Sequence, residues 1–484
     1  MTGGIVLFVS AFFLVFLGIV SMLFFLLPVK FRQLILLVSS YVFCGFVEVR
    51  ALVVLIFISF FTWAAGLKIE KLRVQGRIFF GKTGTVAVTV FFCSLLCGYK
   101  YLPSFFRYCG MDSRLPESVA GQFIMPVGLS FYLFQAIGYL VDIYKGKSQA
   151  ERSFLLLSCH LAFFPKLVSG PIEREQDFLP QLKRLCQVKA WDRGRLSTAF
   201  TYMLWGYFMK MVVADRLAVT VGGIFGNPVE FDSFWLLVGV LFYTIQIYCD
   251  FAGYSYIAIG CAKIFGLELT HNFKAPYLAG SISDFWRRWH VSLSTWLRDY
   301  IYIPLGGNRK GTVRKCINTM IVFLICGMWH GAGINFMIWG LLHGLYSVVE
   351  TISKKMGWKV KGGRMITFFS VAFAWIFFRA DTAGAGFAYI GRMFTAGIHL
   401  EEWGKALKAL NLSGVEIGVI FLGIAVIWLV DNLCNRKKIH LPVLIQYREN
   451  AARYFVFYLL IMTILIFGMY GPGYHAEQFI YMQF

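Results

Sequence analysis

IVLFVSAFFLVFLGIVSMLFFLL, residues 5–27, is a continuous apolar run without a charged side chain. An α-helix of that length extends about 35 Å, enough to cross the roughly 30 Å hydrocarbon core of a bilayer. The run lacks a basic segment before it and a small-residue cleavage pattern after it. We therefore expect a retained membrane helix rather than a signal peptide.

The composition extends this prediction to the rest of the chain. Of the 484 residues, 58% are hydrophobic, 18% aromatic and 15% charged, values that exclude an ordinary soluble protein. We expect an all-α, polytopic bundle of about eleven or twelve transmembrane helices with shorter re-entrant or interfacial helices. The predicted spans lie at 5–27, 33–48, 50–67, 84–101, 126–143, 151–168, 196–214, 233–263, 317–346, 365–378, 414–431 and 452–471.

No repeat or low-complexity linker divides the sequence, so a single membrane domain over 1–484 is predicted. Within it we distinguish N-terminal spans (1–115), a motif-bearing core (116–350) and C-terminal spans (351–484). The eleven cysteines show no Cys-x-x-Cys pair, so neither a metal site nor a disulfide framework is expected.

Basic residues between the spans predict the orientation. The formal net charge is +21, and loops rich in Lys and Arg stay in the cytoplasm, so both termini are expected outside. The same excess would attract anionic lipid or an anionic donor such as a phosphorylated coenzyme; nucleic acid is not expected. The clusters are Lys68–Lys82, Lys183–Arg195, Arg309–Lys315, Lys354–Arg364 and Arg436–Lys438.

The most polar region flanked by apolar sequence predicts an amphipathic helix. Ser283 is suited to cap it, with Asp284 in the first turn. The polar face would hold Arg287, Ser294 and Arg298; the apolar face would hold Trp286, Trp289, Leu293, Trp296, Leu297 and Tyr300. His290 falls at the boundary, where it either points into a wet cavity or merely bonds a neighbour of an anchoring helix.

Two histidines, His290 and His330, each follow a tryptophan in this apolar chain. A neutral imidazole can accept or release a proton near neutral pH without carrying a permanent charge through lipid. His330 is the stronger candidate for a catalytic residue. Asn335 follows it closely and is expected to line the same cavity, whereas packing is the simpler role for His343.

Other polar groups could bind substrate or phosphate, but each has a simpler structural role. Gln246 and Asp250 share one helix face, and an intramembrane Asp most simply pairs with an Arg or bonds a helix end. Arg309 and Lys310 follow a Gly-rich turn that could hold phosphate. Without Walker spacing, a cytoplasmic turn is the simpler interpretation.

Two motifs and several flanking strings closely resemble the membrane-bound O-acyltransferase family, and within it the bacterial alginate O-acetyltransferase membrane subunits. The motifs are Ser283–Gly307 (SDFWRRWHVSLSTWLRDYIYIPLGG) and Met328–Gly333 (MWHGAG). The flanking strings are Pro126–Tyr132, Phe164–Ile172, Gln246–Gly260, Asn272–Tyr277, Trp375–Arg379 and Phe479–Phe484. The family pattern usually has an acidic residue after Gly-Tyr-Ser, where this chain has Tyr256.

The resemblance implies a helix bundle around a central funnel or tunnel. It implies that His330 matches the family's essential histidine and that His290 occupies its second motif position. The residues expected to bind substrate or line the channel are Trp286, Arg287, Trp289, Ser294, Arg298, Asp299, Arg309, Lys310, Trp329, Asn335, Gln246 and Asp250.

The implied activity is transfer of an acetyl group from cytoplasmic acetyl-CoA, with no tightly bound cofactor, for O-acetylation of an extracytoplasmic polysaccharide such as alginate. A periplasmic acetyltransferase partner would finish the transfer from this bacterial inner-membrane protein. Two alternatives stay open at this point. One is D-alanyl transfer to teichoic acid from a carrier protein, and the other is a transporter or flippase of a lipid-linked sugar.

Overall fold

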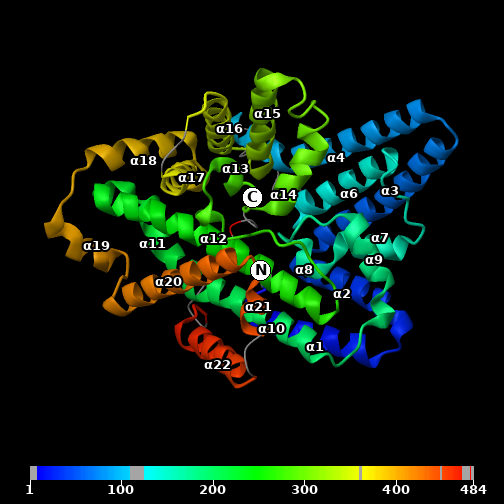
Figure 1. Ribbon diagram of the computed structural model, residues 1–484, viewed down its shortest axis with the longest axis horizontal. Coiled ribbons are helices and arrows are strands. Elements are labelled where there is room, and N and C mark those ends of the chain that lie inside the picture. The colour runs from blue at the N-terminus through cyan, green and yellow to red at the C-terminus, as the bar shows by residue number, and fades with distance from the viewer. Residues whose placement is uncertain (1–7, 110–124, 359–361, 447–449, 471–479, 481–484) are drawn as a thin grey trace. The chain divides into compact units, whose positions relative to one another are not determined.

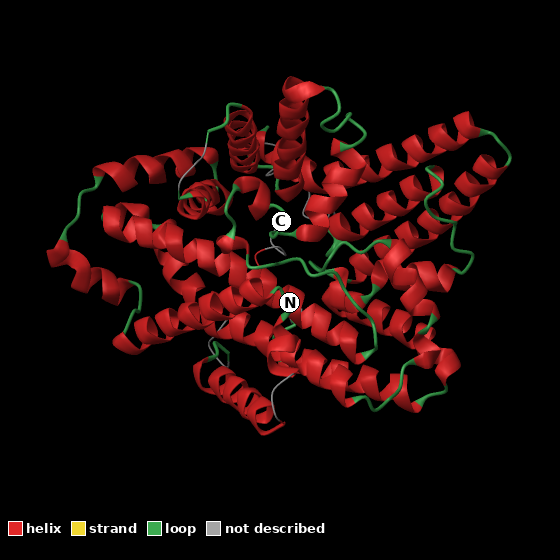
Figure 2. Ribbon diagram, viewed as in Figure 1, coloured by secondary structure: helices red, strands yellow, loops and turns green. Residues whose placement is uncertain are grey.

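The computed structural model describes residues 8–109, 125–358, 362–446, 450–470 and 480. Within these residues the regular structure is entirely helical (Figure 2). This confirms the predicted all-α class. The C-terminal string Phe479–Phe484 lies outside the described residues except for Ile480.

Among the described residues, six segments are helical, long and apolar enough to cross a membrane, as expected for a multi-pass protein. They are Val29–Val47, which contains α2 (Arg32–Val47), α3 (Val49–Val74), α4 (Ile78–Tyr108), α12 (Ser233–Ile264), α15 (Gly311–His330) and α20 (Gly414–Lys437). Shorter apolar helices are α1 (Ala11–Leu26), α6 (Leu129–Tyr144) and α22 (Asn450–Phe467).

Two predicted spans are wrong because local backbone chemistry interrupts them. The expected span 317–346 is broken between α15 and α16 (Ile334–Lys355), where Gly331 has an extended backbone. The expected span 151–168 forms only α7 (Phe154–Ala162) and the four-residue α8 (Phe164–Leu167). Pro165 lacks an N–H and is accommodated in the first turn of a helix, so α7 ends before it.

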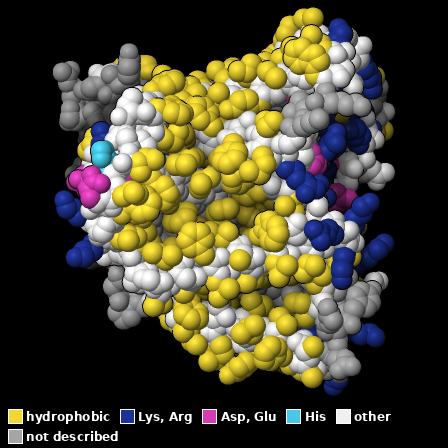
Figure 3. Space-filling model, turned by 60° about the vertical axis from the view of Figure 1, so that its left-hand side comes forward, with side chains coloured by type: hydrophobic (Ala, Val, Ile, Leu, Met, Phe, Trp, Pro, Cys, Tyr) yellow, Lys and Arg dark blue, Asp and Glu magenta, His cyan; other side chains and the backbone are white. Residues whose placement is uncertain are grey.

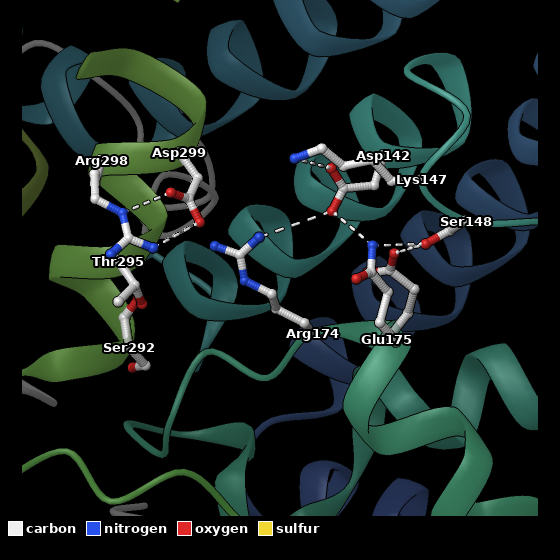
Figure 4. A network of polar contacts seen from close by, with 10 residues as sticks. Asp142, Lys147, Ser148, Arg174, Glu175, Ser292, Thr295, Arg298 and Asp299 are labelled. Carbon is white, nitrogen blue, oxygen red and sulfur yellow. Dashed lines mark hydrogen bonds and ion pairs between the residues drawn. The ribbon is translucent and has the colours of Figure 1, made fainter. Parts of the chain in front are cut away.

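The first of two compact units comprises Met1–Phe200 and Ala258–Thr270. In it α3 packs against α2, α4 and α6, and α2 packs against α7. Asp142 at the end of α6 is fully buried and lies 3.9 Å from Lys147 and 3.8 Å from Arg174, an arrangement that compensates its charge (Figure 4). The unit also contains α9 (Glu175–Lys183) and most of α10 (Arg193–Tyr207).

The second unit comprises Thr201–Ile257 and His271–Phe484. Helices α15 and α16 pack side by side (Figure 1), and glycines at their crossing let the backbones meet. A Cβ on Gly327 would collide with the Phe336 carbonyl, and one on Gly340 with the Phe323 carbonyl. Its remaining helices are α11 (Asp215–Gly226), α13 (Ile282–Phe285), α14 (Val291–Leu297), α17 (Gly363–Arg379), α18 (Ala383–Thr395), α19 (Trp403–Ala409) and α21 (Leu441–Gln446). The unit also contains two π-helical turns, Phe208–Ala214 and Arg298–Tyr302.

One face of the molecule is apolar, as expected of a membrane protein. Figure 3 shows this face covered mostly by hydrophobic side chains, with Lys and Arg most abundant along one edge. On α20, Leu422 is 68% exposed and Trp428 is 60% exposed. Exposure of such side chains is stable where they meet lipid rather than water. The predicted division of the chain at residues 116 and 351 stays a prediction.

Candidate active site

His330 is the last residue of α15 and lies within an aromatic cage. Its ring centroid is 4.8 Å from that of Trp329, 5.0 Å from Trp339 and 5.1 Å from Phe378. Only 2% of the residue is exposed. Because the chain leaves the helix at Gly331, where the Phe336 ring fills the space a side chain would need, the imidazole is held at a break between two helices.

His290, like His330, lies against the Trp329 ring. Its ring centroid is 6.1 Å from that of Trp329 and 4.8 Å from that of Phe251. Its backbone is left-handed, with φ of 43°, a conformation that non-glycine residues adopt mainly where the surroundings require it. Asn272 supplies that constraint, since its carbonyl accepts the Val291 N–H at 3.1 Å and its side-chain oxygen accepts the Ser292 N–H at 3.1 Å.

The predicted continuous amphipathic helix is therefore wrong. The short helix α13 is capped by Ser281, whose hydroxyl accepts the Asp284 N–H, rather than by Ser283. A turn follows, and α14 begins after His290. The left-handed residue ends helical geometry there, which a helical wheel cannot anticipate.

Aromatic residues predicted around the site form a buried layer. Trp289 is 1% exposed and packs against Trp375, with ring centroids 5.1 Å apart. The Trp286 indole N–H donates to His343 Nδ1 at 3.3 Å. His343 Nε2 is buried without a hydrogen-bond partner among the described residues.

A first cavity, the Arg379 cavity, adjoins the His330 cage and has a volume of about 390 Å³. Phe378 forms a wall of this cavity and of the cage. Two predicted site residues, Gln246 and Asn335, line it, as does Arg379, which was not among the predicted site residues. Its lining comprises Ala218, Val221, Tyr243, Gln246, Asn335, Phe336, Phe378, Arg379, Ala380, Asp381 and Ile480.

A second cavity, the basic cavity, has a volume of about 420 Å³ and combines cations with aromatic rings. The cations are Lys274, Arg287, Arg288 and Lys438, and the rings are those of Tyr202, Trp205, Tyr256, Phe273 and His440. Arg288 is committed to Asp284 at 2.9 Å and to Asn435 at 2.7 Å. Among these cations, the sequence analysis predicted only Arg287 as a site residue.

A row of ring contacts joins the two cavities. Successive ring centroids are 5.0, 4.8, 6.1, 4.8 and 5.1 Å apart. The row consists of Phe273, Phe251, His290, Trp329, His330 and Phe378. Phe273 lines the basic cavity and Phe378 lines the Arg379 cavity, so this chain of contacts runs from one lining to the other through both predicted histidines.

Asp250 lies apart from both cavity linings and belongs to a buried ion cluster. Lys210 Nζ lies 2.6 Å from Asp250 Oδ1 and 2.7 Å from Asp215 Oδ1. Asp250 Oδ2 also accepts the Ile480 N–H at 2.8 Å. The expected cationic partner of Asp250 is thus present, but it is Lys210 rather than an arginine. Lys210 lies on a π-helical turn that the sequence pattern does not predict.

The remaining predicted residues are not gathered into a cavity lining. Arg298 pairs with its neighbour Asp299 at 2.7 Å (Figure 4), and the Ser294 hydroxyl donates to the Trp289 carbonyl at 3.3 Å. Arg309 and Lys310 lie in an exposed turn and line neither of the two cavities. The structure therefore groups both predicted histidines in the ring row and leaves this turn out of both cavity linings.

Comparison with known proteins agrees with the motif resemblance. The family model "MBOAT, membrane-bound O-acyltransferase family" matches residues 153–378. The chain is 33% identical over 427 residues to "Probable alginate O-acetylase AlgI" of Pseudomonas putida, covering 85% of this chain and 84% of that protein. It is 30% identical to the peptidoglycan O-acetyltransferase of Helicobacter pylori, over 85% of this chain and 84% of the relative.

A more distant match is the teichoic acid D-alanyltransferase of Bacillus subtilis, 27% identical over 48% of this chain and 61% of that protein. The chain belongs to the membrane-bound O-acyltransferase family and is an O-acyltransferase. Membership of an acyltransferase family favours group transfer over the transporter alternative.

Proposed function

We propose that this protein transfers an acetyl group from acetyl-CoA, bound at the basic cavity, to a hydroxyl acceptor at the Arg379 cavity, with His330 as general base. The observation that carries the proposal is the ring row, a chain of ring contacts that runs through His290 and His330 and has one end in the lining of each of two chemically different cavities. On α12, Gln246 of one cavity and Tyr256 of the other are separated by ten residues, or about 15 Å.

The basic cavity suits the nucleotide end of coenzyme A. Lys274, Arg287 and Lys438 have no ion pair among the described residues, so their charges remain for phosphate. The rings of Tyr202 and Tyr256 stack at an interplanar angle of 11°, which offers a platform for an adenine base. A carrier-bound phosphopantetheine has no base, so this surface favours acetyl-CoA over the carrier protein of the D-alanyl alternative.

The chemistry follows from the position of His330. The acceptor hydroxyl oxygen attacks the thioester carbonyl carbon while the neutral imidazole accepts the hydroxyl proton. Collapse of the tetrahedral intermediate breaks the C–S bond, and the proton passes from His330 to the coenzyme sulfur. The aromatic cage around His330 excludes water that would otherwise hydrolyse the thioester.

The helix directions support a vectorial reaction. Helix α15 begins beside Arg309 and Lys310 and ends at His330, whereas α17 begins beside the basic cluster Lys354–Arg364 and ends at Arg379. If basic loops face the cytoplasm, both helices carry their site residues toward the outside. This orientation, with the N-terminus outside the bacterial inner membrane, suits delivery to a periplasmic acetyltransferase acting on a polysaccharide such as alginate.

The proposed donor site is tested by replacing its basic side chains with neutral ones in the purified enzyme. In the double variant R287Q/K438Q we expect the KM for acetyl-CoA to rise about tenfold or more, because two cations facing phosphate are lost. The matched control is R309Q/K310Q, which removes two cations from the exposed turn. A rise in the control alone would locate the donor phosphates at the turn and contradict the proposed donor site.

A further inference from the structure

His343 presents a hydrogen-bond donor for which the fold supplies no acceptor. The Trp286 indole N–H donates to His343 Nδ1 at 3.3 Å. Because an indole nitrogen can only donate, Nδ1 is unprotonated, and the single proton of the neutral imidazole lies on Nε2. Among the described residues this Nε2–H has no hydrogen-bond partner, and the side chain is fully buried.

Trp339 presents a second donor of the same kind, one helical turn earlier on α16. Its indole N–H is also buried and has no acceptor in the part of the chain that the structure describes. Residues four positions apart lie on one face of a helix, and the ring centroids of Trp339 and His343 are 4.9 Å apart. A buried donor without an acceptor costs about 1–3 kcal/mol. Two such donors on one helix face indicate an acceptor that arrives with a ligand.

Both donors belong to the aromatic layer around the proposed base. The Trp339 ring is part of the His330 cage, with ring centroids 5.0 Å apart. The rings of Phe285 and Phe323 lie within 8° and 23° of parallel to the His343 ring, each at a centroid distance of 6.1 Å. This packing fixes the plane of the imidazole and excludes bulk water. A hydrogen bond to a developing negative charge is strong in such surroundings.

We propose that the N–H groups of Trp339 and His343 bind the thioester carbonyl oxygen and stabilise the oxyanion that forms on it; this inference rests on the proposed function. As the acceptor oxygen bonds to the carbonyl carbon, one electron pair of the C=O bond moves onto the carbonyl oxygen. The two N–H groups hold this charge without giving up their protons, and the pair returns when the C–S bond breaks. A neutral imidazole can act as such a donor. An acetyl group brings only a carbonyl and a methyl group into the aromatic layer.

The test replaces His343 with two amides that place the N–H group differently. The H343Q side chain reaches the position of Nε2 and can donate there. The H343N side chain reaches only the position of Nδ1, where it can still accept from Trp286. With acetyl-CoA as donor and glycerol as a small hydroxyl acceptor, kcat of H343N should fall about 10²–10³-fold with little change in the KM for acetyl-CoA. H343Q should recover at least tenfold of that loss, and H399N, altered at an exposed histidine, should keep the wild-type kcat.

A purely structural role of His343 predicts a different pattern. Equal loss of kcat in H343N and H343Q, or wild-type kcat in folded H343N, would overturn the donor role. W339F keeps an aromatic ring but lacks the indole N–H, so it tests the second donor independently. Its kcat should also fall, and wild-type turnover by W339F would overturn the assignment of Trp339.

The variant H330A separates this inference from the proposed function. If H330A retains transfer while H343N loses kcat and H343Q restores it, the proposed base is wrong and the oxyanion site stands. If H330A abolishes transfer while H343N and W339F keep the wild-type kcat, the proposed base stands and the oxyanion site is overturned.

Discussion

At His290 the fold determines both the backbone conformation and the charge state of the imidazole. Burial lowers its pKa from the ordinary value of 6.5 to about 3, because the charged imidazolium loses its solvation. The ring is therefore neutral at physiological pH. His290 can shape the ring row between the cavities, but it cannot serve there as a cation for phosphate.

This low pKa predicts a pH-dependent stability. In the unfolded chain the His290 ring binds a proton below pH 6.5, whereas in the folded protein it does not. The free energy of unfolding is therefore fully present above pH 6.5 and falls as the pH drops toward 3. Between pH 7 and pH 5 the loss should be about 2 kcal/mol. In H290N, whose asparagine tolerates the left-handed backbone, this contribution should disappear.

Thermal unfolding in detergent at pH 7 and pH 5 measures the effect. The fall in apparent Tm on acidification should be smaller in H290N than in the wild-type protein. An equal fall in both proteins would show that His290 is not held neutral by the fold.

At the level of elements, α10 and α12 approach closely where glycines face each other. A Cβ on Gly206 would lie 2.6 Å from the Gly253 carbonyl oxygen and 2.9 Å from the Ile257 nitrogen. Directly after this crossing, the π-helical turn Phe208–Ala214 positions Lys210 between Asp215 and Asp250. The close approach and the ion cluster thus depend on each other.

Substituting the crossing glycine should therefore separate the helices. G206A is expected to destabilise the protein by about 1–3 kcal/mol, because the methyl group meets backbone atoms that cannot move aside cheaply. G222A is the matched control, since a Cβ on Gly222 of α11 has nothing within 4 Å. There alanine should be neutral or stabilising by up to about 1 kcal/mol. The Tm values of the two purified, folded variants measure the difference, and equal stability of the two variants would contradict the described crossing.

At the scale of the whole molecule, the sequence predicts those features that depend on composition and local chemistry. Long apolar runs predict the all-α membrane class, and the tryptophan before each imidazole in this apolar chain singles out His290 and His330. The structure places these two histidines in one row of rings. It also places Gln246 and Asn335, which are far apart in sequence, in one cavity lining.

Features that depend on tertiary packing could not be predicted. Lys274 and Lys438 resemble ordinary loop cations until folding brings them to one cavity. Lys210 is hidden in a span until a π-helical turn directs it to two carboxylates. The break after His330 lies within an apolar stretch, so hydropathy alone does not reveal it; only the glycines at 331 and 333 indicate it.

The most direct test of the central claim follows radiolabelled acetate from acetyl-CoA through the purified protein in oriented proteoliposomes, with a hydroxyl acceptor on the far side. The account predicts His330-dependent ester on that side and a loss of about 10²–10⁴-fold in H330A, the range typical of a missing general base. Undiminished transfer by a folded H330A protein would contradict the account.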